Sequence, residues 1–104
     1  MREPDGLASS SRLAFLSESE RKSARSIYLA LKEVEEWTSY PSIGDIKEHI
    51  RNSIVKGNGS INYIVVCCAS NLEELRYIDR EAVVAVEAVF GTVSLTDNIV
   101  IEPK

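Results

Sequence analysis

The apolar residues of this chain change their spacing once, near residue 58. Before that point they recur every three or four residues, which is the period of amphipathic helices. After it, branched and aromatic residues stand in nearly continuous runs, which are typical of strands. Because the helical segments precede the extended ones instead of alternating with them, the pattern favours an α+β fold.

The first part of the chain predicts two helices. Ser17 followed by Glu20 is a capping-box pattern, so the first helix should begin there, and Trp37 should close it as a packing residue. A second helix should begin near Ser42 or Ile43 and end at residues 56–59, where a glycine is expected to adopt the left-handed conformation. The core-facing positions of the two helices are Ala24, Ile27, Tyr28, Leu31 and Val34, and then Ile43, Ile46, Ile50 and Ile54.

The second part predicts three strands, over 61–68, 82–90 and 95–101. The second strand is almost entirely apolar and should be central. Residues 70–75 should form a turn with one short helical turn capped by Ser70. The fold class expected is therefore α+β, with two main helices packed on one face of a three-stranded antiparallel sheet.

Few side chains are candidates for chemistry. Cys67 and Cys68 are adjacent in a predicted strand, so they should point to opposite faces and stay reduced. His49 falls at the margin of an apolar stripe, which favours a boundary or surface histidine. Glu87 interrupts an apolar strand; it is either on the open face of a sheet covered on one side or a perturbed acid or base.

Composition narrows the functional classes. A chain of 104 residues with 44% hydrophobic and 27% charged residues predicts one folded domain. Its net charge of -4, with 12 basic residues scattered among 16 acidic ones, argues against nucleic-acid binding. No apolar run approaches the roughly 20 residues that span a bilayer, and the first residues lack the apolar core of a signal peptide, so a cytoplasmic protein without membrane contact is expected.

Two stretches carry a family resemblance, and similarity also runs between them. Residues 2–17 read Arg-Glu-Pro-Asp-Gly-Leu-Ala-Ser-Ser-Ser-Arg-Leu-Ala-Phe-Leu-Ser, which resembles the pantothenate synthetase segment Arg-Glu-x-Asp-Gly-Leu-Ala-Met-Ser-Ser-Arg-Asn-x-x-Leu-Ser. Phe90-Gly91, followed by residues 95–99, is similar to the family's closing Phe-Gly-x-x-Arg-Leu-Ile-Asp-Asn. Residues 62–64 read Asn-Tyr-Ile where the family has Asp-Tyr-Val. The chain is identified through this resemblance as the C-terminal domain of a pantothenate synthetase.

The resemblance implies that full-length relatives use ATP and magnesium to join pantoate to beta-alanine through pantoyl adenylate. By position, Ser10, Ser11 and Arg12 correspond to the loop that contacts the nucleotide's phosphates. Hydroxyls and a guanidinium suit phosphate oxygens chemically, although an ordinary exposed loop is the alternative. Residues 1–16 are expected to form an interdomain arm that carries this loop, and 17–104 the C-terminal-like domain. Without a partner domain, Met1–Leu13 should be a polar arm with little to pack on.

The chain departs from the family pattern at several positions. Ser9 and Leu13 replace methionine and asparagine, and Ser94 stands in place of an arginine. The nucleotide-binding domain that should be its partner is not in this sequence, so the chain alone is expected to be inactive and to need no cofactor or metal of its own. The alternative is a free-standing or engineered non-catalytic module that binds a partner or forms a homo-oligomer.

Overall fold

The computed structural model describes residues 11–40 and 42–103. It contains a 3₁₀ helix, two α-helices and three strands, in an order that matches the sequence expectation. Their bounds are η1 Ser11–Phe15, α1 Glu18–Glu36, α2 Ile43–Lys56, β1 Ser60–Cys68, β2 Ala82–Phe90 and β3 Val93–Ile101.

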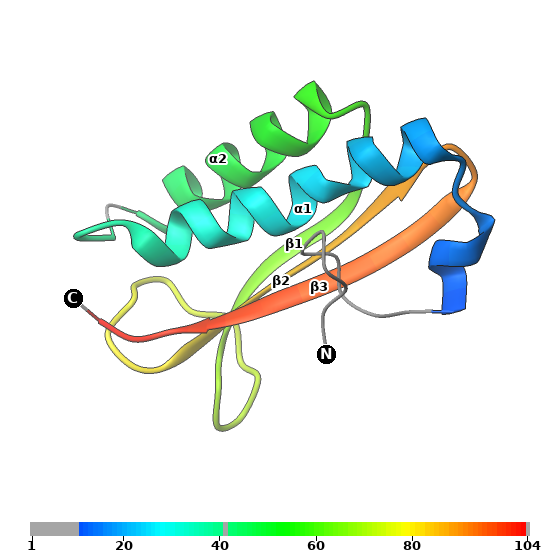
Figure 1. Cartoon of the computed structure of the whole chain (residues 1–104). Helices are drawn as coiled ribbons and strands as arrows, with labels where there is room; N and C mark the ends of the chain where they lie inside the picture. The colour runs from blue at the N-terminus through cyan, green and yellow to red at the C-terminus, as the bar shows by residue number, and fades with distance from the viewer. Residues whose placement is uncertain (1–10, 41, 104) are drawn as a thin grey trace.

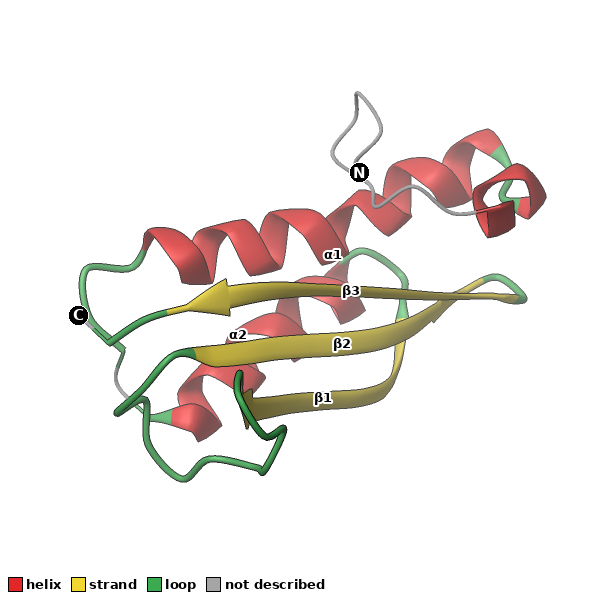
Figure 2. Ribbon diagram, turned by 90° about the horizontal axis from the view of Figure 1, so that it is seen from below, coloured by secondary structure: helices red, strands yellow, loops and turns green. Residues whose placement is uncertain are grey.

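The strands form an antiparallel sheet in the order β1-β2-β3, so β2 is central as predicted. The two α-helices lie side by side and antiparallel over one face of this sheet (Figure 1). Seen from below, the other face of the sheet lies in front of the helices (Figure 2). The predicted α+β architecture, with two helices on one face of a three-stranded sheet, is confirmed.

The side chains of β2 alternate between the two faces, as the pleat of a strand requires. Its even-numbered residues are buried and its odd-numbered residues 83–89 are only half-buried. The helices supply much of the remaining core through the predicted stripes, except that Tyr28 is half-buried, while Ala30 is fully buried. Residues of β1, β3 and η1 complete the core. Each large aliphatic side chain buried here contributes about 2 kcal/mol. The sheet therefore has one covered face and one open face.

The N-termini of both helices are capped as expected. Ser17 Oγ accepts a hydrogen bond from the Glu20 amide at 3.1 Å, and Glu20 Oε1 accepts one from the Ser17 amide at 2.9 Å. Ser42 Oγ accepts from the Asp45 amide at 3.0 Å and starts α2. These bonds satisfy backbone donors that have no partner inside the helix.

At the end of α2, the expectation of a left-handed glycine is wrong. Gly57 has φ of -84°, and the left-handed residue is Asn58, with φ of 66°. Asparagine tolerates this region better than most side chains. Gly57 is needed for a different reason: a Cβ there would lie 2.5 Å from Ser26 Oγ, so glycine lets the end of α2 approach α1 closely.

The segment between β1 and β2 also differs from expectation, because residues 70–75 contain no helical turn. The Asn71 side chain instead accepts a hydrogen bond from the Glu73 amide at 3.0 Å, which holds the chain in a turn. The chain then returns beside β1, where Glu74 pairs with Cys67 in an isolated bridge. The amide of Leu75 donates to the Val66 carbonyl at 3.0 Å.

The β2–β3 connection is a two-residue turn, so β3 begins at Val93, two residues earlier than predicted. Gly91 is the first turn residue and has φ of 64°, the conformation that a type II′ hairpin turn requires there. Its Cα faces the Glu20 side chain, and an added Cβ would collide with Glu20 Oε2. The hairpin turn is thus packed against the capped end of α1.

The expectation that residues up to Leu13 have little to pack on is wrong for Leu13 itself. Its side chain is 6% exposed and belongs to the core cluster, because η1 packs against β3. Leucine in place of the family's asparagine gives this segment an apolar anchor. Residues 1–10 lie outside the described residues.

Replacing Gly91 by alanine should destabilise the domain by about 2 kcal/mol, because a Cβ is disfavoured at positive φ and would displace Glu20. Urea denaturation followed by circular dichroism measures the change. Gly44→Ala is the matched control: the atom nearest to its new Cβ is Ser42 Oγ at 3.6 Å, so a gain of up to about 1 kcal/mol is expected. Equal losses at both positions would contradict this account of the hairpin.

Leu13→Ala should lower the free energy of unfolding by about 2–3 kcal/mol, because it empties a buried site. Phe15→Ala, two residues away, removes a side chain that is 76% exposed and should change stability by less than about 0.5 kcal/mol. Both values come from denaturant titration of the chain. If the two variants behave alike, η1 is not packed on the sheet in solution.

Candidate functional site

Of the three residues assigned to the phosphate loop from the sequence, the structure places the last two. Ser11 begins η1 and Arg12 follows it, whereas Ser10 lies outside the described residues. The Arg12 side chain is exposed, and its Nη1 donates a hydrogen bond to the backbone carbonyl of Ser94 at 3.0 Å. Residues that are 82 positions apart are therefore held together at the outer edge of β3.

This contact joins the two motifs that carry the family resemblance. Ser94 occupies the position of the family's arginine, yet it meets Arg12 through its main-chain oxygen, which any residue would supply. The bond also satisfies an acceptor on an edge strand that no fourth strand covers among the described residues. A guanidinium is planar and carries five N–H donors, a geometry that suits the oxygens of phosphate groups.

An open groove of about 500 Å³, here called the Arg12 groove, lies beside this contact. Arg12 and Phe15 of η1 form one side, and Thr92 and Ser94 from the β2–β3 hairpin form the other, together with Val93. Phe15 is 76% exposed there. The groove combines a cationic side chain, hydroxyls and an exposed aromatic ring, a set that suits an anionic group attached to a flat apolar one.

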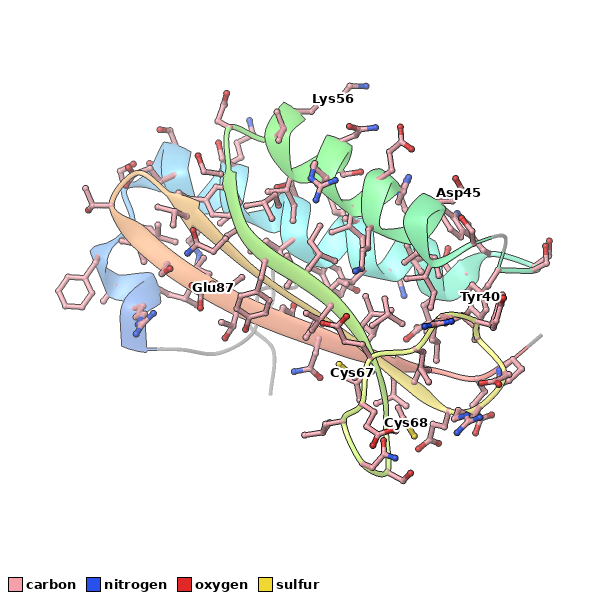
Figure 3. The ribbon with its side chains drawn as sticks, turned by 180° about the vertical axis from the view of Figure 1, so that it is seen from behind. Tyr40, Asp45, Lys56, Cys67, Cys68 and Glu87 are labelled. Carbon is pink, nitrogen blue, oxygen red and sulfur yellow. The ribbon has the colours of Figure 1, made fainter. Side chains whose placement is uncertain are left out.

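Glu87 lies on the open face, near the end of the sheet where η1 runs (Figure 3). Its Oε1 accepts a hydrogen bond from Asn62 Nδ2 at 2.7 Å and a longer one from Ser94 Oγ at 3.4 Å. Asn62 Nδ2 is also 3.4 Å from Ser94 Oγ. These three side chains, one from each strand, are here called the open-face cluster. The expectation that Glu87 faces outward from a sheet covered on one side is confirmed.

Sequence reasoning missed the contribution of Asn62 because strict alternation would put it on the covered face with Ile64. The pairing of β1 with β2 shifts between Ile61 and Tyr63, and this irregularity turns Asn62 toward Glu87. The one signal for it in the sequence was the polar residue itself in an otherwise apolar strand.

The cysteines lie away from the Arg12 groove, next to the loop that follows β1 (Figure 3). Both are free; Cys68 is buried and Cys67 half-buried, which confirms that they face opposite sides. Cys68 Sγ lies 3.1 Å from Ser70 Oγ. This hydrogen bond, followed by backbone hydrogen bonds with Ser70 and Asn71, lowers the pKa of Cys68, although burial acts in the opposite direction.

His49 is half-buried, which confirms a boundary position. Its ring meets Trp37 edge-on with centroids 5.1 Å apart, and its Nε2 lies 3.5 Å from Glu33 Oε1. Because Trp37 and Glu33 belong to α1 and its cap, these contacts join the two helices on the covered side. Trp37 is a packing residue here, as expected.

Two further observations bear on function. Within residues 11–40 and 42–103, no three histidine, cysteine, aspartate or glutamate side chains gather in a way that could hold a metal ion. Among the helices that the structure describes, none is long and apolar enough to cross a membrane.

Comparisons with known proteins agree with the family resemblance that these two motifs carry. The family model for pantoate-beta-alanine ligase matches residues 1–100. Pantothenate synthetase from Thermosipho africanus is 34% identical over 103 residues, and that from Desulfitobacterium hafniense is 38% identical over 108 residues. These alignments cover 97% and 98% of this chain, but only 37% of each relative.

The solved structures give the same result. The crystal structure of pantothenate synthetase from Thermus thermophilus superposes with a TM-score of 0.83 at 28% identity, covering 99% of this chain and 38% of that one. The sequence therefore spans a little over a third of the length of the relatives that it matches. This chain belongs to the pantoate-beta-alanine ligase family, and it corresponds to the C-terminal domain of these enzymes.

Proposed function

We propose that this chain is the lid domain of an ATP-dependent ligase that condenses pantoate with beta-alanine through pantoyl adenylate, and that it is inactive until it meets a nucleotide-binding domain. The family match over residues 1–100 supports this proposal. The hydrogen bond between Arg12 and Ser94 is the observation that carries the proposal. It brings together the two motifs through which the chain resembles the family.

In this proposal, Arg12 meets the phosphates of ATP and offsets the charge that develops as pyrophosphate leaves. Ser10 and Ser11 supply hydroxyls and amides to the same oxygens. The bond to the Ser94 carbonyl holds Arg12 at the rim of the groove, so that little conformational entropy is lost when phosphate binds.

Magnesium, when bound with ATP, would neutralise phosphate charge in the complete enzyme. The described residues of this chain offer no metal-ligating cluster, so we assign the metal's protein contacts to the nucleotide-binding partner. The pathway would operate in the cytoplasm, which remains a prediction from the sequence.

The proposal is tested by mixing this chain with the separately produced remainder of the Desulfitobacterium hafniense enzyme, or by fusing the two in one polypeptide. ATP, magnesium, pantoate and beta-alanine are added, and AMP and pantothenate are measured by liquid chromatography and mass spectrometry. Both products are expected from the combined parts and neither from this chain alone. Arg12→Gln should lower kcat/KM by about a hundredfold, as loss of a preorganised charge does in other active sites.

Arg51→Gln is the matched control, since Arg51 is an exposed arginine on α2. It should leave kcat/KM unchanged. If neither the mixture nor the fusion forms pantothenate while both parts are folded, the proposal is wrong. Size-exclusion chromatography of the chain alone would then examine the alternative of a self-associating module, which requires a stable dimer.

A further inference from the structure

The open-face cluster differs in charge from the pattern of the family. Where the family has an aspartate and an arginine, this chain has Asn62 and Ser94, and the structure shows that these two positions meet. In this chain, both positions therefore carry uncharged side chains. Glu87 lies between the two residues and adds one negative charge.

Within the described part of the chain, no cation in contact with Glu87 balances its charge. Both of its hydrogen bonds come from neutral groups, Asn62 Nδ2 and Ser94 Oγ, and both end on Oε1. Among the residues that the structure describes, no basic side chain forms an ion pair with it. A half-buried carboxylate without a cation projects its field over the open face more strongly than a paired one.

The electric field of the Glu87 carboxylate extends to the Arg12 groove. Glu87 is on the central strand, Ser94 is on its neighbour, and Arg12 lies at the outer edge of that neighbour. Two strand spacings amount to about 10 Å, which is close to the Debye length at 0.1 M salt. Water and salt weaken the interaction at this separation without removing it.

We propose that Glu87 is a specificity determinant of the Arg12 groove: its uncompensated carboxylate weakens the binding of polyphosphate anions there. The inference rests on the proposed function, in which Arg12 meets nucleotide phosphates. Because repulsion grows with the charge of the ligand, triphosphate groups lose more affinity than a single phosphate. An arginine at position 94 would place a cation within reach of Glu87 and cancel the effect.

The probe is inorganic tripolyphosphate, titrated into the 104-residue chain by calorimetry at about 10 mM ionic strength, where the Debye length is about 30 Å. Glu87→Gln removes the charge and keeps an acceptor for Asn62, and it should tighten binding by about threefold or more. Ser94→Arg should tighten it further. The gain should shrink with orthophosphate and in about 0.15 M salt.

Two controls distinguish an effect of the position of the Glu87 charge from an effect of the net charge of the chain. Glu48→Gln removes an exposed carboxylate from α2 and should leave the affinity nearly unchanged. Arg12→Gln combined with Glu87→Gln should lose the gain. Circular dichroism confirms that each variant is folded.

The proposal is overturned if Glu87→Gln binds tripolyphosphate no more tightly than the unmodified chain, or if Glu48→Gln gives an equal gain. It is also overturned if neither Glu87→Gln nor Ser94→Arg binds saturably. This titration needs no partner domain, so its failure is distinct from a failure to form pantothenate in the mixing experiment.

Discussion

The structure depends on the burial of one face of β2 beneath two helices. Five side chains of this strand, at alternating positions from Ala82 to Phe90, are buried against the helices. Because a strand shows every second residue on the same side, that requirement also decides which residues are left on the other face. Glu87 is presented there as a direct consequence, with Val89 and Ala85 beside it.

Several specific contacts join the helices to the sheet at the end where α1 begins and β2 turns into β3. Glu20 closes the capping box of α1 through one carboxylate oxygen, while the other lies against Gly91 in the β2–β3 turn. Leu13 packs into the core nearby, and Arg12 bonds to the edge of β3. Local capping, the hairpin turn and the family's two motifs therefore meet in one region, so the groove lies where several elements contact one another.

Much of this fold could be predicted from the sequence because its signals are local. The capping box at Ser17 and the period of the apolar stripes depend on neighbouring residues, and both were placed correctly. Some local expectations were wrong, such as the helical turn in residues 70–75, and two other features depend on longer-range packing. Gly57 is a glycine because α1 passes close to it, and Leu13 is buried because β3 lies beneath it, and neither fact is visible in the local sequence.

The candidate site likewise combines features that could be predicted from the sequence with a contact that could not. Residue types pointed to Arg12 through family resemblance, and the alternation of β2 pointed to an outward Glu87. The meeting of Asn62, Glu87 and Ser94 could not be foreseen, because it depends on an irregular register between β1 and β2. Sequence spacing alone cannot show where a bulge turns a side chain.

The pairing of Cys67 with Glu74 has a consequence for how the sheet could grow. It covers part of the outer edge of β1, near the start of β2, while Arg12 and η1 cover part of the outer edge of β3, near the end of β2. The two blocked stretches lie at diagonally opposite corners. A further strand added to either edge would therefore find only a partial template, which disfavours extension of the sheet from molecule to molecule.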